Sequence, residues 1–147
     1  MTEAALPTPE ELAAMSKLFG LLDESGCRRL LAGARRWTAT DCEVICREGE
    51  KGEDFFVVLA GTVAVSADDF GRAKPIASLG RGDFFGEMAV LARQPRSATC
   101  VAQGEVSLLA FARRVVEDVL EDYPSVREIL GHIGLKRTEE LLEKLSD

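Results

Sequence analysis

Histidine, on which many metal sites and enzymes depend, is scarce in this chain, and the cysteines are scattered. There is one histidine, His132, and the four cysteines lie at positions 27, 42, 46 and 100. Cys42 and Cys46 fall on a predicted strand segment, which would place them about 13 Å apart, too far to share a metal ion alone. A zinc site needs three or four such ligands close together. We therefore expect buried, reduced thiols and no metal.

Long apolar runs and an excess of basic residues are absent as well. No apolar run approaches the roughly 18 residues that span a bilayer, and residues 1–11 lack the basic and apolar regions of a signal peptide. The formal net charge of −7 disfavours direct binding of nucleic acid, whose phosphates need lysine and arginine. Arginine pairs at 28–29, 35–36 and 113–114 fit solvated helix ends and turns. We expect a cytoplasmic protein without a membrane segment.

The organisation of the chain follows from its hydrophobic periodicity. Helical spacing is found in the N-terminal part, residues 1–36, and in the C-terminal part, residues 112–147, where Pro124 interrupts the pattern. The predicted helices are 9–19, 24–34, 113–122 and 125–145.

Short β-rich runs, separated by glycine-marked turns, occupy residues 37–111. The predicted strands are 37–40, 44–46, 55–60, 62–66, 76–79, 99–102 and 106–111. This pattern favours an antiparallel jelly-roll β-barrel. We therefore expect a mainly β fold with flanking helices, as one domain over residues 1–147.

Residues 80–99 combine features that suit a small anion carrying a sugar hydroxyl. A helix start at Gly86 would offer unpaired backbone N–H groups, which attract phosphate. Arg96 adds a permanent charge in a planar fork that can bond phosphate twice. Glu87 repels phosphate, so beside such a site it would instead accept a hydrogen bond from a hydroxyl. A nucleotide with few charges meets both requirements.

These residues resemble the phosphate-binding cassette of the cyclic nucleotide-binding domain family. The likeness rests on Phe85-Gly86-Glu87-Met88-Ala89-Val90 and, after a spacer, Pro95-Arg96-Ser97-Ala98-Thr99. Further family marks upstream are Glu48-Gly49-Glu50, Gly52, Phe55-Phe56-Val57-Val58, Gly61 and Gly82-Asp83. The resemblance covers Leu18 to the end of the chain and implies a double-stranded β-helix barrel with the cassette at 85–99.

The resemblance also implies roles for single residues. Arg96 would oppose the exocyclic phosphate oxygens, Glu87 would accept the ribose 2′-OH, and Gly86 would let the backbone approach the ribose. The phosphate cradle would be completed by backbone N–H groups at Ala89, Ser97 and Ala98. The Ser97 hydroxyl is either a further donor or part of an ordinary strand edge.

The base would rest on apolar side chains. The candidate walls are Val63, Val65, Met88, Cys100 and Val101, each of which fits equally well as core. In the family a side chain of the last helix often covers the base, and Arg137 is the candidate here, because a guanidinium can stack on a purine. A solvated helix face explains Arg137 equally well.

The implied function is binding of a 3′,5′-cyclic nucleotide. We favour cAMP over cGMP because some cGMP-preferring relatives carry threonine at the position of Ser97. Gly131 and Gly134 weaken the last helix, which we interpret as a lid that docks on the base; close packing against the barrel is the alternative. The residues after the barrel are too few for a DNA reader, a pore or an enzyme, so the output would reach a second copy of the chain, a protein partner or a fused module.

Two other classes remain open from the sequence. One is a protein-interaction domain that kept this fold and lost the ligand, against which the presence of Glu87 and Arg96 argues. The other is an enzyme of the related double-stranded barrel type, which usually needs several histidines for a metal, whereas this chain has one.

Overall fold

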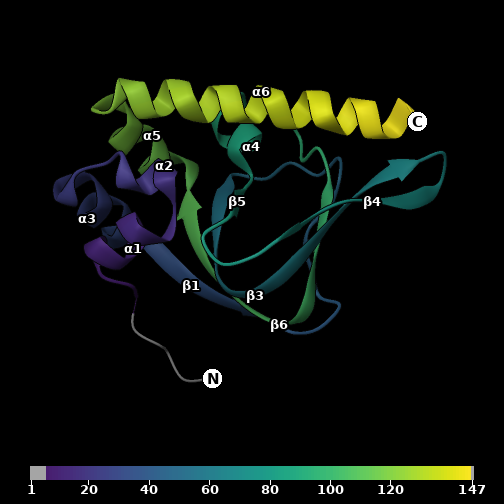
Figure 1. Cartoon of the computed structure of the whole chain (residues 1–147), viewed down its shortest axis with the longest axis horizontal. Helices are drawn as coiled ribbons and strands as arrows, with labels where there is room; N and C mark the ends of the chain where they lie inside the picture. The colour runs from purple at the N-terminus through teal and green to yellow at the C-terminus, as the bar shows by residue number, and fades with distance from the viewer. Residues whose placement is uncertain (1–5, 147) are drawn as a thin grey trace.

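The computed structural model describes residues 6–146, shown in Figure 1. The prediction that residues 1–11 are not a signal peptide falls partly on residues 1–5, which lie outside the described residues. In chain order the elements are α1 (Pro9–Met15), α2 (Lys17–Gly20), α3 (Glu24–Ala32), β1 (Ala34–Ala39), β2 (Val44–Cys46), β3 (Asp54–Asp69), β4 (Arg72–Leu79), β5 (Phe84–Phe85), α4 (Glu87–Leu91), β6 (Thr99–Ala112), α5 (Arg113–Glu121) and α6 (Pro124–Ser146). The strands form one antiparallel sheet in the order β1-β6-β3-β4, with β2 paired to β6 and β5 paired to β3. The predicted mainly β fold with helices on both flanks is confirmed.

The predicted single helix over residues 9–19 is wrong, because the chain forms two helices there. Ser16 between them has an extended backbone, with φ of −148°. Its side chain accepts a hydrogen bond from the Leu18 amide at 3.3 Å and so caps the start of α2. Because the Ser16 side chain bonds a backbone amide that would otherwise be free, the chain begins a second helix here and does not continue α1.

The strands β3 and β6 are longer than the sequence pattern predicts. Gly61 and Gly104, interpreted as turns, have φ of +92° and +75° and yet lie inside these strands. The register between the strands shifts from Val58 to Thr62, beside the two glycines. Because glycine adopts positive φ without strain, the pair forms an irregularity that bends a continuous ribbon instead of ending it.

The strand β3 separates two cores, because successive side chains of a strand face opposite sides. Phe55, Val57 and Leu59 pack with the helices, whereas Phe56 and Val58 fill the interior of the rolled sheet. These side chains are at most 5% exposed. The sheet is therefore held on both faces and gives the cassette a rigid support.

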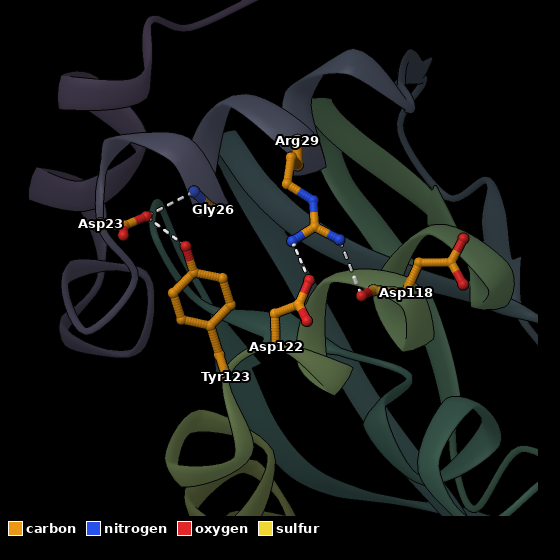
Figure 2. A network of polar contacts seen from close by, with 6 residues as sticks. All are labelled: Asp23, Gly26, Arg29, Asp118, Asp122 and Tyr123. Carbon is orange, nitrogen blue, oxygen red and sulfur yellow. Dashed lines mark hydrogen bonds and ion pairs between the residues drawn. The ribbon is translucent and has the colours of Figure 1, made fainter.

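Polar contacts fasten α3 to the junction between α5 and α6, as Figure 2 shows. Asp23, the N-cap of α3, accepts hydrogen bonds from the Gly26 amide at 2.8 Å and from the Tyr123 hydroxyl. The Tyr123 hydroxyl is the main reason that the pKa of Asp23 lies below its ordinary value. Nearby, Arg29 pairs with Asp122 at 2.7 Å. The N-terminal helices therefore hold the point from which α6 departs.

The helix α6 is continuous over 23 residues and runs from α5 past α4 toward β4 (Figure 1). Pro124 begins it, so the predicted interruption between two C-terminal helices is confirmed. A Cβ on Gly134 would stand 2.5 Å from Met88 Sδ, whereas a Cβ on Gly131 would meet no described atom within 4 Å. Close packing thus accounts for Gly134 but not for Gly131.

We expect Gly131→Ala and Gly134→Ala to change stability differently. Alanine is preferred to glycine inside a helix, so Gly131→Ala should raise the free energy of unfolding by about 1 kcal/mol. Gly134→Ala should gain less or lose stability, because its methyl group displaces the Met88 thioether. Urea unfolding of both variants measures the difference. Equal gains would show that α6 does not rest on Met88.

Candidate ligand-binding site

A cavity of about 180 Å³ lies between the cassette, the sheet and α6. The predicted site residues that line it are Gly86, Glu87, Met88, Ala89, Arg96, Ser97, Ala98, Val65 and Arg137. The cavity lining does not include Val63 or Val101. Val63 is fully buried among the interior side chains of the sheet, and Val101 is half-buried on β6 opposite Val44. Val63 therefore belongs to the core and not to the cavity wall.

Arg96 is held through both its backbone and its side chain. Its amide donates to the Glu50 carbonyl, and its own carbonyl accepts from the Gly49 amide, each at 2.8 Å. A Cβ on Gly52 would stand 2.3 Å from Arg96 Nε, so the side chain lies where only glycine leaves room. Its guanidinium carbon is 5.6 Å from the centre of the Phe56 ring. The loop between β2 and β3 thus positions this arginine.

One nitrogen of this guanidinium, Arg96 Nη1, is buried and has no hydrogen-bond partner among residues 6–146. Leaving a buried donor unpaired costs about 1–3 kcal/mol, and more for a charged group. Arg113 Nε and Ser107 Oγ are also buried without a partner in this part of the chain, but neither residue lines the cavity. An anion at this point of the cavity would supply the partner that Arg96 Nη1 lacks.

Gly86 lies against the same nitrogen. It is the N-cap of α4, with a left-handed φ of +91° and no side-chain cap. A Cβ here would stand 2.7 Å from Arg96 Nη1 and 2.7 Å from the Asp54 carbonyl oxygen. A larger residue would displace the guanidinium and strain the backbone. The preceding residue, Phe85, stacks on Phe56 at 4.9 Å, which fixes the start of α4 against β3.

Glu87 is a buried carboxylate, with 7% of its side chain exposed. Arg137 Nη1, from α6, donates to both carboxylate oxygens at 3.1 Å and to the Phe84 carbonyl at 2.8 Å. The Arg137 guanidinium also lies 4.6 Å from the centre of the Phe84 ring. Arg137 thus ties α6 to α4 instead of standing free above the cavity or in solvent. Carboxylate oxygens keep further lone pairs, so Glu87 can still accept a hydrogen bond from a hydroxyl.

Arg113 holds α4 from a second direction. Its side chain is 17% exposed, so the prediction of a solvated arginine pair at 113–114 is wrong for this residue. Arg113 Nη2 donates to the Ala89 carbonyl at 2.9 Å, and Nη1 lies 3.5 Å from Glu53 Oε1. The short helix α4 is therefore fixed by arginines from both α5 and α6.

The comparison with known families agrees with this geometry. The Cyclic nucleotide-binding domain family matches residues 38–123. The chain belongs to this family. A cyclic nucleotide-gated potassium channel of Rhizobium etli is 34% identical over 127 residues, which are 86% of this chain and 34% of the channel. The chain thus spans about a third of the length of that relative.

Solved structures of the family share the fold. A cAMP-bound PfPKA-R superposes with a TM-score of 0.81 and 26% identity, covering 91% of this chain and 45% of that one. A second structure, PKAR CBD2 bound to Sp-2Cl-cAMPS, gives a TM-score of 0.80 and 26% identity, covering 93% of this chain and 88% of that one. The predicted fold and family are therefore confirmed.

The sequence did not predict some of the residues that line the cavity, because segments far apart in the chain bring them together. Cys42 is exposed in a turn with φ of +68°, so placing it on one strand with Cys46 is wrong. Cys46 is instead the register partner of Cys100 across β2 and β6, and both line the cavity; Cys100 was predicted there, whereas Cys46 was not. On another wall, Lys144 of α6 donates to the Ile76 carbonyl of β4. No local sequence signal indicates either contact.

Two further classes of feature are not found in the part of the chain that the structure describes. Its helices do not combine the length and apolar character that crossing a membrane requires. Within the same residues, histidine, cysteine and acidic side chains do not gather into a group that could hold a metal ion.

Proposed function

We propose that this chain binds a 3′,5′-cyclic nucleotide, cAMP in preference to cGMP, and passes binding on through α6 to a partner or fused module. The observation that carries the proposal is the buried Arg96 Nη1 at the cavity, which has no hydrogen-bond partner in the described part of the chain. A cyclic phosphate diester has one negative charge, which a single guanidinium neutralises. An anionic ligand would supply the partner that this nitrogen lacks, which favours a ligand-binding domain over one that has lost its ligand.

The remaining groups fit the rest of such a ligand. Glu87 lies next to Gly86 on the chain and can accept a hydrogen bond from a ribose hydroxyl. Val65, Ile76 and Leu79 supply apolar surface on the sheet side of the cavity, where a base can rest. The preference for cAMP rests on serine at position 97 and on the cAMP-bound relative among the solved structures.

Transmission would proceed through α6, because this helix forms one wall of the cavity. The α6 residues that line it are Gly134, Arg137, Thr138, Glu140, Leu141 and Lys144. A ligand in the cavity would therefore contact α6 directly. It would also bond to Glu87, the carboxylate to which Arg137 of α6 donates. A ligand can shift the equilibrium between two positions of α6 only by the difference between its affinities for the two. In this proposal the chain acts as one regulatory unit and not as an enzyme.

Arg96→Leu should weaken binding of cAMP at least tenfold while the fold survives. A charge-assisted hydrogen bond contributes about 1.5–3 kcal/mol, and about 1.4 kcal/mol corresponds to a factor of ten. Titration calorimetry measures the loss. Arg93→Leu is the matched control, since Arg93 is 70% exposed and pairs with Glu117 across 3.8 Å. Unchanged affinity in Arg96→Leu, or equal losses in both variants, would contradict the role of Arg96.

Bound cAMP should slow amide hydrogen exchange over residues 125–140, because the ligand adds contacts to α6. Mass spectrometry of the exchanging chain measures this, with α3 as an internal reference that should not change. If protection of α6 is the same with and without a saturating concentration of cAMP, the helix does not respond to the ligand.

A further inference from the structure

The cavity wall contains two thiols that face each other. Cys46 on β2 and Cys100 on β6 are register partners, and the register shift between Val44 and Cys46 brings them into line. The two thiols interact, because each shifts the pKa of the other. Both are nearly buried, with 7% and 5% of the residue exposed, yet both line the cavity. A small molecule in the cavity therefore reaches a preformed pair of thiols.

The surroundings distinguish the two sulfurs. The hydrogen bond from Cys100 is the main reason that the pKa of Cys46 is lowered, and the Arg96 charge adds to this effect. The pKa of Cys100 is raised, first by its hydrogen bond to Cys46 and then by burial. Cys46 is therefore the better placed of the two thiols to act as the nucleophile, and Cys100, its register partner, is placed to resolve the oxidised form.

The other two cysteines lack this arrangement. Cys27 is buried in the core beneath the helices, and burial raises its pKa. Cys42 is exposed in the turn before β2. Neither lines the cavity. They therefore provide a buried and an exposed reference within the same chain.

We propose that Cys46 and Cys100 form a peroxide-reactive dithiol, which closes to a disulfide in the cavity wall and is protected when a nucleotide occupies the cavity. The Cys46 thiolate attacks hydrogen peroxide, the O–O bond breaks, and the departing hydroxide takes a proton and leaves as water. The Cys100 sulfur then attacks the sulfenic sulfur of Cys46, the S–O bond breaks, and a second water leaves with the Cys100 proton. Two thiols are oxidised and one peroxide is reduced to two waters.

Protection by a nucleotide rests on the proposed function. A phosphate bound at Arg96 neutralises the charge that favours the Cys46 thiolate, and the ligand fills the space through which peroxide approaches. Both effects slow the first step. Formation of the disulfide itself requires no nucleotide, so the two parts of the proposal can be tested separately.

The test treats the full chain carrying Cys42→Ser with hydrogen peroxide and maps its thiols by mass spectrometry. We expect a loss of two hydrogen atoms, located in a Cys46–Cys100 linkage and reversed by dithiothreitol, while Cys27 stays a free thiol. Cys46→Ser and Cys100→Ser should each abolish this loss. Because the parent chain gives the linkage directly, the result does not depend on how well the single variants fold. Oxidation without this linkage, or no reaction while Cys27 is modified, overturns the dithiol.

The rate of disulfide formation is then measured with saturating cAMP, in samples whose binding is followed by calorimetry. We expect cAMP to slow the reaction at least about threefold, and adenosine, which lacks the phosphate, to slow it less. If cAMP binds and the rate is unchanged, the protection is overturned while the proposed function stands. If cAMP does not bind, the proposed function fails, and the protection fails with it even if the disulfide forms.

Discussion

The cavity is organised around the Arg96 guanidinium, one nitrogen of which is buried and finds no partner within residues 6–146. Arg96 can occupy its position only because glycines stand at 52 and 86, where a Cβ would come within 2.3 and 2.7 Å of its nitrogens. The backbone of the β2–β3 loop holds the arginine at 2.8 Å on both sides. The fold thus brings a loop, a strand end and a short helix together around a single charge, at a place where a bound anion would complete the hydrogen bonding.

The second constraint is that one carboxylate serves two parts of the molecule. Glu87 belongs to the cassette, but its partner Arg137 comes from α6; the Glu87 carboxylate is buried, whereas 35% of the Arg137 side chain is exposed. A group that contacts the ligand site and the C-terminal helix at once gives a physical link between occupancy and helix position. Removing one partner of such a pair leaves the other charge without its match, so we expect a change at Glu87 to alter how α6 is held.

The sequence predicted the features that depend on local chemistry. The helix start at Gly86 beside Glu87 and the interruption at Pro124 between two helices both follow from residue types at short spacing. Gly61 shows where this reasoning fails. Whether a glycine with positive φ ends a strand or bends it depends on the partner strand, and the partner here lies more than 40 residues away in the chain, at Gln103 to Ser107.

The same limit applies inside the candidate site. Cys46 and Cys100 are register partners because the register shifts between β2 and β6. The Arg137 guanidinium lies over the Phe84 ring because α6 passes close to α4. Neither is encoded in a short motif. Val63 and Val65 are two residues apart on one strand with similar side chains, yet the structure leaves only Val65 at the cavity.

A crystal structure of this chain with cAMP tests the central claim most directly. The account predicts an exocyclic phosphate oxygen at about 2.7–2.9 Å from Arg96 Nη1, with the ribose hydroxyl on Glu87. A complex in which the phosphate lies elsewhere and Arg96 Nη1 keeps no partner would contradict it.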